Sequence, residues 1–189
     1  MQHNRTQIWH KYSPYFVNRA PNILKPWLNE QNSLTQAVVN SCVGKFKVRI
    51  YRQHWGKVTL SEQNQLNIQS NTYCFIRQVH LFCNNTPWIF ARTVVPISTL
   101  RGELEKLTHL GTQPLGAILF ANPIIQRDNI EIAKIDYRNE IYQFAMEFSK
   151  TNNNTDIWGR RSRFTLKRKP LLVSEIFLPT IPTKYLTCH

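Results

Sequence analysis

The sequence predicts an α+β fold built on a single antiparallel sheet of about six strands. β-rich runs follow one another along the chain with short polar links between them, as in a series of hairpins. Helical patterns are few and short, and they do not alternate regularly with the strands. The length of 189 residues suits one core, so we expect a single domain over residues 1–189.

The first third of the chain changes from helical to strand character. Residues 1–20 are expected to form an irregular arm, and Ser33 is placed to cap a short amphipathic helix that ends at Gly44. The next stretch, "GKFKVRIYRQHW", alternates apolar and polar side chains, which predicts a strand with one wet face. Residues 59–70 are mostly polar and are predicted to form a loop.

The remainder contains two hairpins separated by short helices. "NNTP" joins two β-rich runs within residues 72–98, which indicates the first hairpin. "STLRGELEKLTHLG" predicts a helix that Ser98 or Thr99 caps and Gly111 ends, and a second helix is predicted to begin near Pro114. Three further segments follow: a strand in "IIQRDNIEIAKID", an Asn-rich insertion at 137–156 whose first part has helical character, and a last hairpin at 157–178.

The charge of the chain is strongly positive. Lys and Arg number 24 against 11 Asp and Glu, a net charge of +13, so nucleic acid, acidic lipid and small carboxylates all remain possible partners. The densest block, residues 159–169, carries six basic residues and no acid. It is interpreted as a solvated strand edge with a basic turn in preference to a phosphate-binding patch, because a basic run without a recognition fold discriminates poorly.

The sequence contains no motif for a metal site, a phosphate-binding loop, a nucleophile elbow, a membrane span or a secretory signal. The four cysteines, Cys42, Cys74, Cys83 and Cys188, contain no CxxC pair, and the histidines lack HExxH spacing, so neither a disulfide framework nor a metal site is expected. No glycine-rich phosphate cradle or GxSxG elbow occurs. No apolar run approaches the ~18 residues of a membrane span, and "MQHNRTQIWHKY" lacks the apolar core of a secretory signal, so a cytoplasmic location is expected.

Two charged residues fall on rows of side chains that otherwise face a core. In the run 171–178, strand alternation groups Glu175 with Leu171, Val173 and Phe177. In "TYCFIRQVHLFC", the same test leaves Arg77 as the lone charge in an apolar row. Burying either charge costs several kcal/mol unless a partner compensates it.

Two interpretations of this pair stay open at the level of residues. Arg77 and Glu175 could form a buried salt bridge that only holds two strands in register. Alternatively they lie in a mostly apolar pocket that binds a small flat anion, for which the planar guanidinium of arginine is well suited.

The chain resembles the chorismate–pyruvate lyase family in motifs that occur in the same order. The resemblance covers most of residues 72–182, and "WLNEQNSLTQ" near the N-terminus is similar to a further segment of that family. The motifs are "PWIFARTVVPISTL" (87–100), "LGTQPLG" (110–116), "RDNIEI" (127–132), "WGRRSRF" (158–164) and "KPLLVSEIFLP" (169–179).

This resemblance implies a fold and a reaction. The fold would be a six-stranded antiparallel sheet with helices over one face and two helical flaps closing a buried site. The reaction would convert chorismate to 4-hydroxybenzoate and pyruvate, the first committed step of ubiquinone biosynthesis, without metal or organic cofactor. A flat aromatic product held under flaps predicts slow release and product inhibition.

The resemblance also implies which residues form the site. Arg77 and Glu175 would be the charged ligand residues and carry the catalysis, while Leu34 and Leu115 would contact the substrate through their backbone. Leu34 stands where the family commonly has Met, and the insertion at 137–156 exceeds the family's short link. The expected partners are chorismate and 4-hydroxybenzoate, and a monomer without nucleic acid is expected.

Two competing functions come from other classes. A sensor module that binds a small aromatic carboxylate without turnover is one, since the ligand domains of some transcription regulators resemble this fold. A basic nucleic-acid-binding protein is the other, suggested by the charge of +13 and the five tryptophans. Both rank below the lyase.

Overall fold

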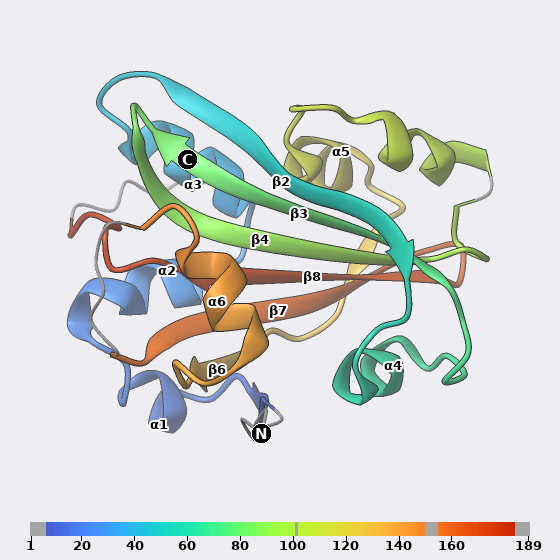
Figure 1. Ribbon diagram of the computed structural model, residues 1–189, viewed down its shortest axis with the longest axis horizontal. Helices are drawn as coiled ribbons and strands as arrows, with labels where there is room; N and C mark the ends of the chain where they lie inside the picture. Colours follow the sequence, from blue (N-terminus) through green and yellow to red (C-terminus); the bar gives the residue numbers. More distant parts are fainter. Residues whose placement is uncertain (1–6, 101, 150–154, 184–189) are drawn as a thin grey trace.

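The computed structural model describes residues 7–100, 102–149 and 155–183, without the side chains of 102–104. It contains one antiparallel sheet and short helices (Figure 1), which confirms the α+β class. The strands are β1 His10–Lys11, β2 Phe46–Gly56, β3 Cys74–Cys83, β4 Thr86–Pro96, β5 Gln126–Arg127, β6 Glu131–Ile135, β7 Ile157–Leu166 and β8 Lys169–Phe177. The α-helices are α1 Pro14–Val17, α2 Lys25–Asn29, α3 Leu34–Ser41, α4 Leu60–Leu66, α5 Leu115–Ala121 and α6 Glu140–Met146, and the 3₁₀ helices are η1 Asn22–Leu24 and η2 Gly102–His109.

The sheet has eight strands in the described residues, so the predicted number of six is wrong. The strand order is β1-β6-β7-β8-β4-β3-β2, and β5 pairs with β7. The two additional strands, β1 and β5, are two residues long each. Such short segments carry no alternation pattern, and only their pairing with β6 and β7 makes them strands.

Strand register defines two faces of the sheet. Arg77 on β3 lies opposite Thr93 on β4, which lies opposite Val173 on β8; we call the side that carries these residues face A. Gln78, Arg92 and Ser174 follow the same register on the other side, face B. Side chains of successive residues therefore serve different faces, as the alternation in the sequence predicts.

Helices cover both faces, which corrects the expectation that they cover one. Residues of α3 and α5 line a cavity together with Arg77 and Val173 on face A, whereas residues of α4 and α6 line a cavity with Gln78 and Ser174 on face B. Figure 1 shows α6 in front of the sheet and α3 behind it. The Asn-rich insertion supplies α6, whose buried Tyr142 and Ala145 pack in an apolar cluster on the sheet. Residues 150–154 of the insertion lie outside the described residues.

Residues 59–70 contain a helix, α4, where the sequence analysis predicted a loop. The Thr59 side chain accepts a hydrogen bond from the Glu62 backbone N–H, and the Glu62 carboxylate accepts one from the Thr59 backbone N–H. This reciprocal capping box corresponds to "TLSE" in the sequence, a helix-start signal that outweighs the polar composition of the segment. Buried Leu66 anchors the last turn of the helix.

A disulfide joins Cys42 to Cys83, contrary to the expectation of no disulfide. Cys42 is the C-terminal cap of α3 and Cys83 is the last residue of β3. The fold brings these two ends together although 41 positions separate them in the chain, and cysteine spacing gives no sign of this. The bond ties α3 to the strand that carries Arg77.

Most of the core lies between face A and the N-terminal helices. Trp27, Leu28 and Ala37 are fully buried there and pack with Val79 and Ile89 of the sheet. Among the described residues, no helix is both long and apolar enough to cross a membrane.

Candidate functional site

A cavity on face A, here cavity A, holds all four residues that the sequence analysis nominated. Arg77 and Glu175 contribute side chains from the sheet, and Leu34 and Leu115 contribute from the first turns of α3 and α5. The remaining wall is largely apolar, with Val79, Leu81, Ala91, Leu119, Phe120, Phe164 and Val173 among its members. The enclosed space is about 40 Å³.

Arg77 is a buried cation without an acidic partner in the described part of the chain. Its residue is 3% exposed, and its Nη2 donates hydrogen bonds to the carbonyls of Gly111 (2.9 Å) and Gln113 (3.0 Å). The buried Nε has no hydrogen-bond partner among the residues that the structure describes. Burial lowers the pKa of Arg77 from its ordinary value. Only some of the N–H donors of this guanidinium are used, so it can still donate hydrogen bonds to an anion.

Glu175 pairs with Arg160 and not with Arg77. The interpretation of Arg77 and Glu175 as a salt bridge between two strands is therefore wrong. The Glu175 Oε2 accepts from the Nε of Arg160 at 2.7 Å, and Arg160 lies opposite Glu175 in the β7–β8 register. Arg160 is 1% exposed and also donates to the carbonyls of Trp27 and Glu30, which fixes its position. Within the described residues, the second oxygen of Glu175 accepts no hydrogen bond, so it can serve a ligand.

Leu34 and Leu115 each begin a helix, α3 and α5 respectively. The backbone N–H groups of a first helical turn have no partner inside the helix and carry its positive end. The two starts lie close together: a Cβ on Gly116 would meet the Ser33 Oγ at 3.0 Å and the Thr35 Oγ1 at 3.1 Å. Glycine at position 116 therefore permits α3 and α5 to approach each other beside the cavity.

Sequence reasoning missed Arg160 because it lies in the basic block 159–169. That block was interpreted as a solvated strand edge, which is wrong for Arg160 and Arg161. Strand β7 lies between β6 and β8, so both its edges are paired, and the two buried arginines form ion pairs with Glu175 and Glu131. The interpretation holds only for the exposed turn at 167–168.

Arg127 is a further cation near this site that the sequence analysis did not single out. Its guanidinium carbon lies 5.7 Å from the ring centre of Phe120 and 5.5 Å from that of Phe164, and both rings line cavity A. Burial and the positive charge of Arg160 lower the pKa of Arg127 to about 10, against the opposing influence of Glu175. Arg127 is the first residue of "RDNIEI", and nothing in that segment indicates a position beside the cavity.

Solved structures of low sequence identity share this fold. The C-terminal domain of the histidine utilization repressor from Pseudomonas syringae aligns with a TM-score of 0.58 and 10% identity, over 73% of this chain and 94% of the other. The ligand-binding domain of a GntR-family transcriptional regulator from Bordetella bronchiseptica gives 0.54 and 15%, over 77% and 90%. Similarity at this level concerns the fold alone.

Sequence relatives are much closer. A protein of Nitrosomonas europaea named "Probable chorismate pyruvate-lyase" is 36% identical over 181 residues, 96% of this chain and 98% of the relative. One of Psychromonas ingrahamii with the same name is 39% identical over 161 residues, 82% of each. The sequence model of the family described as chorismate lyase matches residues 6–186. The resemblance seen in the sequence is thus confirmed: this chain belongs to the chorismate lyase family and is a lyase.

Proposed function

We propose that cavity A converts chorismate to 4-hydroxybenzoate and pyruvate, the first committed step of ubiquinone biosynthesis, without a metal or organic cofactor. The observation that carries the proposal is the buried Arg77, which faces an apolar cavity with unused donors while Glu175 is engaged by Arg160 instead. The two relatives align with 96% and 82% of this chain, and their names support the same substrate.

Arg77 is the group that would hold the ring carboxylate of chorismate. A guanidinium donates charge-assisted hydrogen bonds to a carboxylate, and the unpartnered Nε is a donor that the two bonds from Nη2 to backbone carbonyls leave free. The amides at Leu34 and Leu115 would add donors at two helix starts. Arg127 adds positive charge behind the Phe120 and Phe164 wall, which favours a dianion.

Glu175 is the acceptor proposed for the opposite end of the substrate. The bond between the ring carbon and the ether oxygen breaks, and the oxygen leaves with the enolpyruvyl group. The electron pair of a ring C–H bond becomes the new ring double bond, and the proton it releases ends on the methyl group of pyruvate. Aromatisation supplies the driving force, so positioning and charge stabilisation suffice for catalysis. Glu175 would accept from the ring hydroxyl or relay this proton, with Arg160 fixing its carboxylate.

Entry of the substrate requires the site to open, because cavity A encloses only about 40 Å³. The helices α3 and α5 are the proposed flaps, since their first turns line the cavity and meet at Gly116. Separating them would expose Arg77 and Glu175. Product release would need the same movement, which makes slow release and product inhibition the expected behaviour.

The direct experiment is to incubate the purified chain with chorismate in the presence of EDTA and to quantify both products by chromatography. Equal amounts of 4-hydroxybenzoate and pyruvate, formed in proportion to enzyme, support the proposal. The Arg77→Gln variant is the matched control for background decay of chorismate. If wild type and variant release pyruvate at the same rate as buffer alone, the proposed reaction is wrong.

A ligand-binding role without turnover is the second candidate, because the fold is shared with ligand-binding domains of transcription regulators. The same incubation separates the two functions. Saturable binding of 4-hydroxybenzoate without any conversion of chorismate would favour the sensor.

A further inference from the structure

Face B carries a row of polar side chains that crosses the sheet in register. One residue from each of six strands lies in this polar row, flanked by apolar rows such as Ile76, Val94 and Leu172. Three of the six are arginines, on a face that α4 and α6 partly cover. The polar row consists of Arg52, Gln78, Arg92, Ser174, Arg161 and Glu131, on β2, β3, β4, β8, β7 and β6 respectively.

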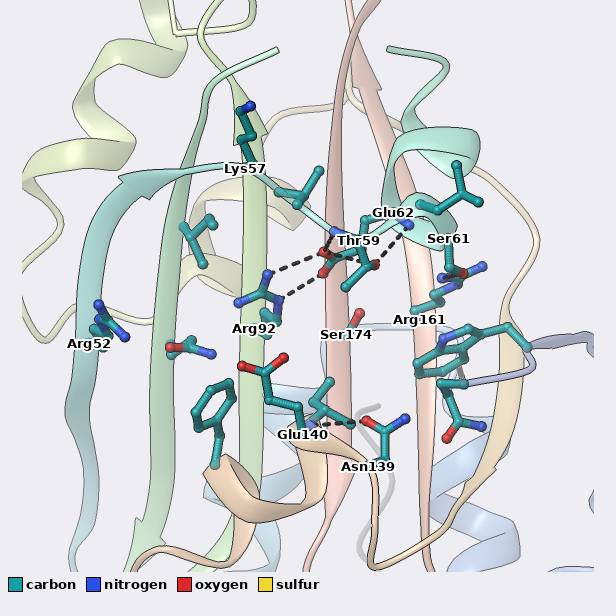
Figure 2. Close-up of a pocket in the computed structure, with 18 of the residues that line it drawn as sticks. Arg52, Lys57, Thr59, Ser61, Glu62, Arg92, Asn139, Glu140, Arg161 and Ser174 are labelled. Atoms are coloured by element: carbon teal, nitrogen blue, oxygen red, sulfur yellow. Dashed lines mark hydrogen bonds and ion pairs between the residues drawn. The ribbon is translucent and has the colours of Figure 1, made fainter. Parts of the chain in front are cut away.

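The polar row, apart from Glu131, forms one wall of a second cavity, cavity B, of about 440 Å³. Helix α4 and the start of α6 border it, and Figure 2 shows Arg52, Arg92, Ser174 and Arg161 spread across the strands with Glu62 and Glu140 facing them. Apolar side chains complete the lining, among them Ile76, Val58, Ile141 and Phe144. A volume of this size accommodates a small organic molecule.

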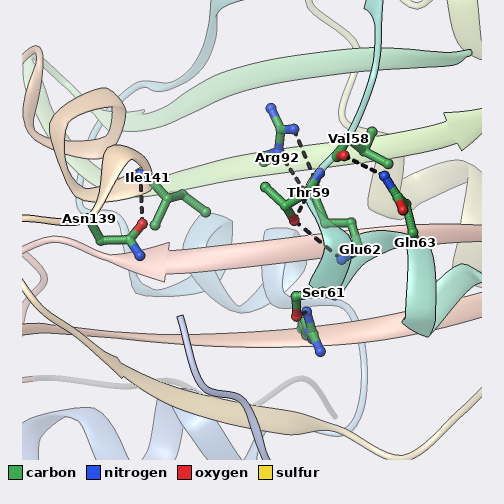
Figure 3. A network of polar contacts seen from close by, with 9 residues as sticks. Val58, Thr59, Ser61, Glu62, Gln63, Arg92, Asn139 and Ile141 are labelled. Carbon is green, nitrogen blue, oxygen red and sulfur yellow. Dashed lines mark hydrogen bonds and ion pairs between the residues drawn. The ribbon is translucent and has the colours of Figure 1, made fainter. Parts of the chain in front are cut away.

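Two of the arginines in cavity B are already neutralised. Arg92 donates from Nε (2.7 Å) and Nη2 (3.2 Å) to the buried Glu62, whose carboxylate also caps α4 through Thr59 (Figure 3). Arg161 donates to Glu131 at 2.6 Å and, from Nη1, to Ser61 at 2.9 Å. These pairs hold α4 and β6 in place, so their role is to stabilise the walls of the cavity.

Other groups in cavity B lack partners within the described residues. Gln78 is 1% exposed, and its Nε2 is buried without a hydrogen bond. A buried donor left unpaired costs free energy, which a bound acceptor would recover. Arg52, Lys57 and Glu140 line the cavity and form no ion pair within the described residues, which leaves an excess of one positive charge. Burial and the charges of Arg52 and Arg92 lower the pKa of His54, so it adds no charge at neutral pH.

We propose that cavity B binds a small monocarboxylate with a flat apolar body. Its carboxylate lies between Arg52 and the Gln78 amide, and its body packs on Ile141 and Phe144. One negative charge matches the excess of one positive charge, which disfavours a phosphate dianion. The site lies on the opposite face of the sheet from cavity A and does not depend on the reaction proposed there.

Benzoate is the probe, and ¹H–¹⁵N correlation spectra of the full chain report where it binds. The Gln78 side-chain amide resonance, assigned by its absence in Gln78→Leu, is expected to shift saturably with benzoate. The shift should persist in Arg77→Gln, which disables cavity A. Arg52→Gln keeps a polar side chain at an exposed position and should weaken binding about tenfold or more through loss of the charged hydrogen bonds.

Gln78→Leu is a second variant that separates ligand binding from folding. Because the native amide leaves a donor unpaired, leucine should not lower the melting temperature, while benzoate should no longer raise it through cavity B. Benzoate stabilisation is therefore measured in Arg77→Gln with and without Gln78→Leu. The proposal is overturned if the Gln78 resonance never shifts, if the shift disappears in Arg77→Gln but survives in Arg52→Gln, or if inorganic phosphate binds as tightly as benzoate.

Discussion

Replacing Arg77 with glutamine tests cavity A at the residue on which the proposed function depends. Arg77 is 3% exposed, donates two hydrogen bonds to backbone carbonyls and keeps an unpaired Nε. Glutamine retains a polar side chain of similar reach but cannot present a charged fork to a carboxylate. We therefore expect substrate binding and turnover to suffer while the fold survives.

The size of the effect follows from the bonds lost. A hydrogen bond to a charged group contributes about 1.5–3 kcal/mol, so two such bonds to the ring carboxylate contribute about 3–6 kcal/mol in total. At 1.36 kcal/mol for each factor of ten, kcat/KM should fall about 10²- to 10⁴-fold. Stability should change less, because losing the bonds to Gly111 and Gln113 is offset by removing a buried cation.

The assay follows pyruvate release with lactate dehydrogenase and NADH, next to circular dichroism and a melting curve of the same protein. Arg77→Lys is the comparison variant, since lysine keeps the charge without the planar fork, and an intermediate kcat/KM is expected. A folded Arg77→Gln protein whose kcat/KM stays within about threefold of wild type would refute the assignment of Arg77 to the substrate carboxylate.

Three further predictions concern other residues. Glu175→Gln should lower kcat about 10²- to 10⁴-fold with a smaller change in substrate binding, and full activity would reduce Glu175 to a structural role. Cys42→Ser opens a loop of 41 residues to Cys83 and should cost about 4 kcal/mol of stability; dithiothreitol should lower the melting temperature of wild type only. Burial lowers the pKa of His80 from 6.5 to about 4, so the unfolded chain binds the extra proton between these values. The free energy of unfolding should therefore drop by about 3 kcal/mol as pH falls from 6.5 to about 4. Urea titrations should show that this drop is missing in His80→Phe, and a variant with the same pH profile as wild type would contradict the prediction.

Strand alternation predicted the charged pair of the site from residues alone. Arg77 and Glu175 both lie on face A, as the apolar rows around them indicated, and both line cavity A. The starts of α3 and α5 were also predicted, because the Ser33 cap and the proline at 114 act through their immediate neighbours. These features depend on contacts between residues close in the chain or on the period of a single strand.

A bulge in β2 is one feature that the alternation could not reveal. Register with β3 passes from Ile50 opposite Val79 to Arg52 opposite Gln78, so Tyr51 is an additional residue in β2. After it, every side chain changes face, and Arg52 joins the polar row on face B instead of following Ile50 onto face A. A strict period of two assigns Arg52 to the wrong side.

By itself the sequence determined the α+β class, the six longer strands, the starts of α3 and α5 and the inward position of Arg77 and Glu175, because propensity, capping and side-chain period are local properties. Only the tertiary structure decided that Arg160 is the partner of Glu175, that Cys42 reaches Cys83, and that a polar row crosses face B. These pairings join positions far apart in the chain, and strand order and register, which no single segment encodes, bring them together.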